Sequence, residues 1–126
     1  MTAQRATQRT LLIVDDEEKI CRVLAEYFAL KGYDVSIVHD GEAALARADA
    51  ARPDVVLLDL LMPGMSGMDV LKMLKQRQPR LPVVIVSASD RQEAEQQVLQ
   101  LGADAYLSKP VNFAALGDVV EKLLKP

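Results

Sequence analysis

One short apolar run, residues 55–58, constrains the fold of this chain more than any other segment. Four apolar residues between Asp54 and Asp59 predict a strand that is buried on both faces, as the inner strands of a parallel sheet are. Pro63 and Gly64 end the segment, because proline cannot continue a ladder of hydrogen bonds and glycine permits a turn. Asp59 is therefore expected at the carboxyl end of a central strand, where open parallel sheets bind their ligands.

The length and charge of the chain narrow the class of protein. Its 126 residues suffice for one domain with a proper core, and its net charge of −3 gives no general attraction to nucleic acid or to anionic membranes. Cys21 is the only cysteine, so a reducing compartment, the cytoplasm, is the simplest interpretation. No apolar run approaches the ~18 residues of a membrane span. Residues 1–10 are polar and predict a short disordered leader before a domain at 11–126.

Strand and helix patterns alternate along the chain. Strand patterns occupy 11–14, 35–38, 55–58, 83–86 and 105–107, and helical patterns occupy 17–31, 42–51, 66–78, 91–101 and the stretch after Asn112. Right-handed crossovers between successive strands then give a parallel sheet with helices on both faces, an α/β fold. At least two strand orders fit this pattern. The first, third and fourth strands are the most apolar and belong in the middle, which favours the doubly wound, five-stranded, flavodoxin-like order 2-1-3-4-5.

Other single residues receive structural interpretations. The residues placed as N-caps or in capping boxes are Asp40, Ser66 with Asp69, Asp90 with Glu93, and Asn112. Gly32 is placed as a helix stop. Cys21 lies on an apolar helical stripe and is expected in the core, and His39 has no histidine or cysteine partner at ligand spacing, so it is assigned no metal or catalytic role. The helix 91–101 has few apolar residues and is expected to be loosely packed.

Polar residues stand at the ends of four of the predicted strands. They are Asp15 and Asp16 after strand 11–14, Asp59, Ser87 after strand 83–86, and Lys109 just beyond strand 105–107. Because the carboxyl ends of parallel strands meet at one edge of the sheet, we expect these side chains to lie close together. Three carboxylates so close raise one another's pKa, which a hard divalent cation such as Mg²⁺ relieves. A cation, a lysine and a hydroxyl around a carboxylate form a cradle for a phosphoryl group, and the carboxylate can itself be the nucleophile.

Several other kinds of site are absent from the sequence. No P-loop motif and no dinucleotide-binding glycine motif occurs, and no serine has a histidine placed for a catalytic triad. A single aspartate at a strand end is usually a helix cap or a solvated residue. Acids, a hydroxyl and a lysine at the same edge of four strands are much harder to obtain by chance.

Four motifs, taken together, match one known family. They are Val14-Asp15-Asp16-Glu17; Leu58-Asp59 followed by Met62-Pro63-Gly64 and Gly67; Val86-Ser87-Ala88; and the stretch from Gly102 to Lys109-Pro110. With these motifs, residues 11 to 125 resemble the receiver domain of bacterial two-component response regulators, in the manner of the chemotaxis regulators. The domain at 11–126 is accordingly expected to be a receiver domain.

The resemblance implies a phosphorylation-activated signalling switch. Asp59 would accept a phosphoryl group from a phosphohistidine of a sensor histidine kinase or a phosphotransfer protein. Asp16 and Asp59 would bind Mg²⁺ directly, together with the backbone carbonyl of Leu61, and Asp15 would act mainly through water. Such a chain is not a classical enzyme, although it assists its own Mg²⁺-dependent phosphorylation and dephosphorylation.

The resemblance also assigns the residues that respond to the phosphoryl group. Lys109 would pair with the phosphoryl oxygens or with Asp59, Ser87 would donate a hydrogen bond to the phosphoryl group, and Tyr106 would be the aromatic switch. The peptide bond between Lys109 and Pro110 is expected to be cis.

The implied output surface consists of the helix 91–101, the strand 105–107 and the last helix. An output domain or a partner protein would bind this surface, and a homodimer formed on phosphorylation is a further expected partner. Direct contact with nucleic acid or membrane is not expected of this domain.

Two other functions fit the sequence less well. A small aspartyl-phosphate hydrolase of similar topology needs a second aspartate two residues after the nucleophile, and Leu61 occupies that position. A receiver-like interaction module that is not phosphorylated would not need the set of polar residues that this chain retains, which are Asp15, Asp16, Asp59, Ser87 and Lys109.

Overall fold

The computed structural model describes residues 8–88 and 92–125, in which strands and helices alternate. The elements are β1 (Thr10–Val14), α2 (Glu18–Leu30), β2 (Asp34–Val38), α3 (Gly41–Ala50), β3 (Val55–Leu58), α4 (Gly67–Arg77), β4 (Val83–Ser87), α5 (Gln92–Gln100), β5 (Ala105–Ser108) and α6 (Phe113–Leu124). All strand pairs are parallel, and the order in the sheet is β2-β1-β3-β4-β5. This confirms the predicted doubly wound order, with the three most apolar strands inside.

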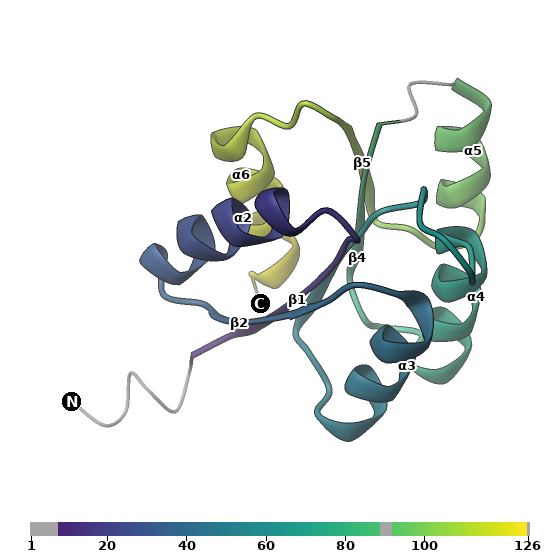
Figure 1. The fold of residues 1–126 in the computed structure, drawn as a ribbon, viewed down its shortest axis with the longest axis horizontal. Coiled ribbons are helices and arrows are strands. Elements are labelled where there is room, and N and C mark those ends of the chain that lie inside the picture. The colour runs from purple at the N-terminus through teal and green to yellow at the C-terminus, as the bar shows by residue number, and fades with distance from the viewer. Residues whose placement is uncertain (1–7, 89–91, 126) are drawn as a thin grey trace.

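Helices cover both faces of the sheet. Figure 1 shows α2 and α6 on one side of the strands and α3, α4 and α5 on the other. Successive side chains of a strand point to opposite faces, so Leu11 and Ile13 join the core under α2 and α6, whereas Leu12 and Val14 join the core under the other three helices. Every residue of β3 is buried, as the apolar run between two aspartates predicts.

The predicted helix caps are present where the structure describes them. The side chains of Asp40, Ser66 and Asn112 each accept a hydrogen bond from the backbone N–H three residues later. Gly32 follows α2 with a φ of +99°, a left-handed conformation that glycine adopts without a steric penalty. The capping box predicted at Asp90 lies outside the described residues, as does most of the predicted leader at 1–10.

The burial of Cys21 and the sparse packing of α5 are as expected from the sequence. Cys21 is buried in the core under α2 and α6. Val98 is the one fully buried residue of α5, so this helix is anchored by few side chains. The edge strand β2 has no fully buried residue. Among the described residues, no helix is both long enough and apolar enough to cross a membrane.

Candidate functional site

Three buried polar side chains meet at the carboxyl edge of the sheet. In the part of the chain that the structure describes, the fully buried polar or charged residues are Asp15, Asp59 and Ser87. Asp15 follows β1, Asp59 follows β3, and Ser87 is the last residue of β4. In the sheet, β3 lies between β1 and β4. Buried polar groups are costly unless they are paired, so their collection at one edge marks this edge as the candidate site.

Asp59 is the central carboxylate of this site. The backbone N–H of Asp59 donates to the carbonyl of Val14 at 2.9 Å, which fixes its position beside β1. The side chain is 4% exposed, and its Oδ1 accepts a hydrogen bond from the Leu61 N–H at 3.1 Å. Burial raises the pKa of Asp59; the Leu61 hydrogen bond opposes this increase, and the charge of Asp15 adds to it.

Gly67 allows α4 to begin close to this carboxylate. A Cβ atom at position 67 would collide with the carbonyl oxygen of Asp59 and with Cα of Leu60. The Gly67 N–H also donates to the Leu60 carbonyl at 3.2 Å. A residue without a side chain is therefore required where the loop after β3 turns back toward Asp59.

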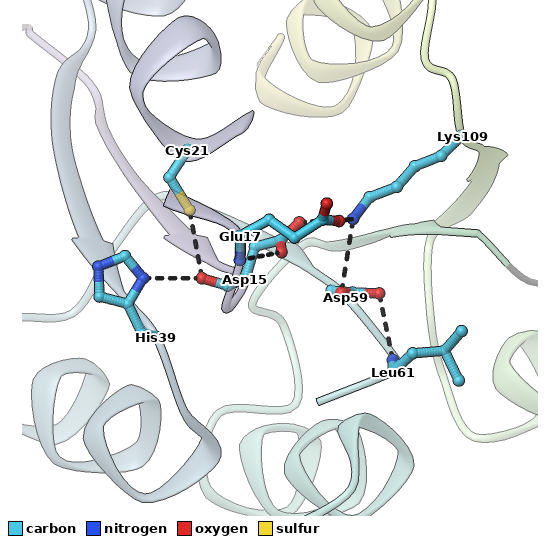
Figure 2. A network of polar contacts seen from close by, with 7 residues as sticks. All are labelled: Asp15, Glu17, Cys21, His39, Asp59, Leu61 and Lys109. Atoms are coloured by element: carbon cyan, nitrogen blue, oxygen red, sulfur yellow. Dashed lines mark hydrogen bonds and ion pairs between the residues drawn. The ribbon is translucent and has the colours of Figure 1, made fainter. Parts of the chain in front are cut away.

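Lys109 reaches into the site from the loop after β5 (Figure 2). Its Nζ lies 2.8 Å from Asp15 Oδ2, 3.1 Å from Glu17 Oε1 and 3.5 Å from Asp59 Oδ2. Burial alone would lower the pKa of Lys109, but its hydrogen bonds to Asp15 and Glu17 outweigh this effect and hold the pKa above its usual value. The lysine is therefore a permanent cation that already faces the phosphoacceptor predicted at Asp59.

Carboxylate oxygens of Asp15, Glu17 and Asp59 lie within 4.8 Å of one another. An all-oxygen set of this kind suits a hard divalent cation. Asp16, which the resemblance makes a direct ligand, is exposed and is not a member of this group. Glu17 was not predicted as a site residue; the only sequence signal for it was its place directly after the two aspartates.

The remaining predicted residues lie around this cluster. Ser87 is completely buried, and its carbonyl accepts a hydrogen bond from the Lys109 N–H at 2.9 Å. Tyr106 pairs with Ile85 in the sheet and packs on the core under α3, α4 and α5. The buried Tyr106 hydroxyl has no hydrogen-bond partner among the described residues. The peptide bond between Lys109 and Pro110 is cis, as predicted.

The fold and this acidic edge are those of one protein family. Residues 11–121 match the family model of the response regulator receiver domain, and the chain belongs to this family. Receiver domains of response regulators interact with histidine kinases and with output domains.

Individual relatives agree with this assignment. The sensory transduction protein RegX3 of Mycobacterium tuberculosis is 46% identical over 107 residues, which are 85% of this chain but only 47% of RegX3, so the chain spans about half the length of that relative. The receiver domain of the Francisella response regulator 1452 has 32% identity and a TM-score of 0.88, with 93% of this chain and 97% of that chain covered. The BeF3-activated receiver domain of DrrB has 28% identity and a TM-score of 0.88, with 95% and 100% covered.

Proposed function

We propose that this chain is a phosphorylation-activated switch whose Asp59 accepts a phosphoryl group from a phosphohistidine of a sensor histidine kinase or a phosphotransfer protein. The observation that carries the proposal is the buried Asp59 carboxylate, which directly follows the central strand β3 and lies close to Lys109 and Asp15. Membership of the receiver family supports it. Phosphoryl transfer depends mainly on positioning and on charge stabilisation, and this edge supplies both.

The transfer exchanges one bond to phosphorus for another. An oxygen of Asp59 attacks the phosphorus, the phosphorus–nitrogen bond breaks, and the donor imidazole leaves with the electron pair. Oδ1 of Asp59 accepts the Leu61 N–H at 3.1 Å, whereas Oδ2 has only the longer contact of 3.5 Å to Lys109, so we propose that Oδ2 is the attacking oxygen. Lys109 then neutralises charge on the phosphoryl oxygens, and the Ser87 hydroxyl donates to one of them.

We further propose that Mg²⁺ is the cation of this site. The residues that would hold it are Asp16 and Asp59 with the Leu61 backbone carbonyl, and Asp15 would act mainly through water. When bound, the cation supplies positive charge that offsets the carboxylates and the phosphoryl oxygens. The oxygen atoms gathered from Asp15, Glu17 and Asp59 support this choice of a hard cation.

We propose that a partner recognises the phosphorylated state by binding the surface of α5, β5 and α6. α5 is the helix with a single fully buried residue, so it is the element most easily displaced. Because this chain spans about half of RegX3, the occupant of the surface is proposed to be an output domain, a partner protein or a second receiver domain.

Phosphorylation of the purified chain tests this function. Incubation with a small phosphodonor and Mg²⁺ should add one phosphoryl mass, and peptide mapping should place it on Asp59. Asp59→Asn should remove the labelling, whereas Asp69→Asn, at an acidic residue in the first turn of α4, should leave it unchanged. Normal labelling of Asp59→Asn would show that another residue is the phosphoacceptor.

A further inference from the structure

Two side chains from different elements converge on one backbone oxygen at the edge of the site. His39, which follows β2, has its Nδ1 at 2.9 Å from the carbonyl oxygen of Asp15, and Cys21 of α2 donates to the same oxygen from Sγ at 3.2 Å. Figure 2 shows both side chains pointing at this carbonyl from the side away from Lys109. They are the only histidine and the only cysteine of the chain, and the proposed phosphoryl chemistry uses neither.

The other polar atoms of Asp15 are also engaged. Its N–H donates to the Val38 carbonyl at 3.2 Å, its Oδ1 accepts the Glu17 N–H at 3.0 Å, and its Oδ2 accepts Lys109. Two of these contacts are made by the backbone of neighbouring segments and one by the site lysine. His39 and Cys21 are thus the two side chains from outside the site that hold Asp15.

The carbonyl that they hold belongs to the peptide that joins Asp15 to Asp16. A peptide unit is planar, so holding its oxygen restricts the rotation of that plane, and with it ψ of Asp15 and φ of Asp16, on which the directions of the two side chains depend. Asp16 is exposed, so core packing does not hold its side chain. The position of its carboxylate therefore depends on the direction of the backbone. We propose that His39 and Cys21 are positioning residues, which orient the peptide between the two aspartates so that their carboxylates meet the cation and Lys109. This inference rests on the proposed function and names a further part of its machinery.

The chemistry of the two donors fits this role. A carbonyl oxygen only accepts hydrogen bonds, so the Nδ1 atom of His39 carries the proton. Burial raises the pKa of Cys21 to about 11, and the charge of Asp15 adds to the effect, so the thiol remains protonated at neutral pH. The thiol is the weaker donor of the two, and we expect the larger effect at His39.

An open hollow of about 190 Å³ lies beside the two donors, lined by Glu18, Cys21, Arg22, Ile37 and His39. Water can enter it and replace a lost donor with little loss of hydrogen-bond energy. A mobile water does not hold the carbonyl in one direction, however. Removing the His39 donor should therefore change the function of the site more than the stability of the fold.

Matched pairs of variants test this inference. His39→Asn retains a nitrogen donor at the position of Nδ1, and His39→Leu has a similar shape without a donor. Cys21→Ser and Cys21→Ala form the corresponding pair in α2. For each variant of the full chain, calorimetry gives the Mg²⁺ affinity without phosphorylation, labelling by a small phosphodonor at several Mg²⁺ concentrations gives the rate, and thermal unfolding gives the stability.

We expect His39→Leu to weaken Mg²⁺ binding and to slow labelling by about three- to tenfold, the size of one net hydrogen bond. His39→Asn should stay within about twofold of the parent, and Cys21→Ala should show a smaller loss that Cys21→Ser restores. Parent-like Mg²⁺ affinity and labelling in His39→Leu would overturn the inference, and so would equal losses in the two His39 variants. The Mg²⁺ titration needs no phosphorylation. It therefore tests the positioning role of His39 and Cys21 even if Asp59 proves not to be the phosphoacceptor.

Discussion

Lys109 donates from Nζ to Asp15 Oδ2 at 2.8 Å, and both side chains of this ion pair are largely buried. The same nitrogen lies 3.5 Å from Asp59, so the lysine is held mainly by Asp15 and Glu17, the acids beside the proposed phosphoacceptor. A phosphoryl group on Asp59 would offer the lysine new acceptor oxygens with more charge. We therefore expect phosphorylation of Asp59 to cause an exchange of partners at Lys109.

Lys109 is held less strongly by Glu17 than by Asp15. The side chain of Glu17 is 57% exposed, and exposed ion pairs contribute only about 0–1 kcal/mol. At saturating Mg²⁺, we expect Glu17→Gln to free Lys109 in part and to speed the labelling of Asp59 by up to about fivefold. Glu18→Gln, at the next residue, is the control and should label at the parental rate. Slower labelling of Glu17→Gln would mean that Glu17 assists the reaction instead of restraining the lysine.

The burial of Asp59 predicts that its charge destabilises the fold when no cation is present. Its pKa is raised above 3.8 in the folded chain, so the folded chain keeps this proton at pH values where the unfolded chain has lost it. Stability therefore falls as the pH rises through the interval between the two pKa values, and the full loss persists at neutral pH. Without Mg²⁺ at pH 7, we expect Asp59→Asn to stabilise the fold by roughly 1 kcal/mol, a rise in Tm of about 4 °C.

Thermal unfolding in a chelator at pH 7 and near pH 3.5 measures this effect. The gain in stability of Asp59→Asn over the parent should shrink at the acid pH. At that pH Asp59 of the folded parent is largely protonated, so the parent and the variant are both close to neutral at position 59. An advantage of equal size at both pH values would show that charge is not its cause.

Mg²⁺ binding should depend on Asp16, because a cation with few protein ligands needs each carboxylate. Calorimetric titration should show binding in the parent and in Asp69→Ala, and its loss in Asp16→Ala. The chain has no tryptophan, so quenching of tryptophan fluorescence cannot report Mg²⁺ binding, and thermal unfolding is the second measurement. A cation at ten times its Kd should stabilise the parent by about 1.4 kcal/mol. Parental binding by Asp16→Ala would transfer the ligand role to the group of Asp15, Glu17 and Asp59.

The side chain at position 61 should influence how long the phosphoryl group persists. Leu61 is 58% exposed next to Asp59 and cannot hydrogen-bond a water molecule for hydrolysis. Leu61→Asn and Leu61→Glu can orient such a water, and each should shorten the lifetime of phospho-Asp59 by about three- to tenfold. Loss of phosphoryl mass with time measures the lifetime, and Leu99→Asn, at an exposed leucine of α5, is the control. Unchanged lifetimes in both Leu61 variants would refute the idea.

Tyr106 carries a buried hydroxyl that has no partner among the described residues. An unpaired buried hydroxyl costs roughly 1–3 kcal/mol, so Tyr106→Phe should stabilise the fold, with a rise in Tm of a few degrees. If a phosphoryl mimic shifts Tyr106 to a state in which the hydroxyl is paired, this advantage should shrink when beryllofluoride is bound. Thermal unfolding of both chains, with and without the mimic, gives the comparison.

Amide signals of the parent report on the same switch. With beryllofluoride at Asp59, the largest changes are expected within residues 87–110, and α2 should change little beyond its first turn. If the mimic is demonstrably bound and neither Tyr106 nor α5 responds, the proposed roles of Tyr106 as the switch and of α5, β5 and α6 as the output surface are wrong for this chain.

The sequence by itself determined the fold and most of the residues that gather at the site, although it missed Glu17. Short apolar runs alternate with amphipathic stretches, and this spacing permits little besides a parallel sheet with helices on both faces. The carboxyl ends of such strands meet at one edge, so the gathering of Asp15, Asp59, Ser87 and Lys109 followed from their places in the chain. These four residues could be placed from the sequence because their positions depend on the backbone, whose course the apolar pattern dictates, whereas Asp16, also predicted at this edge, is exposed and lies outside the acidic group.

Only the tertiary structure decided which side chains touch within that site. In this structure Glu17, and not Asp16, turns toward the acidic cluster, Lys109 lies nearer to Asp15 than to Asp59, and His39 and Cys21 meet at the carbonyl of Asp15. No periodicity encodes these contacts, because they depend on side-chain directions where β1, β2 and α2 pack together. A change of one side-chain rotamer in that packing would exchange one partner for another.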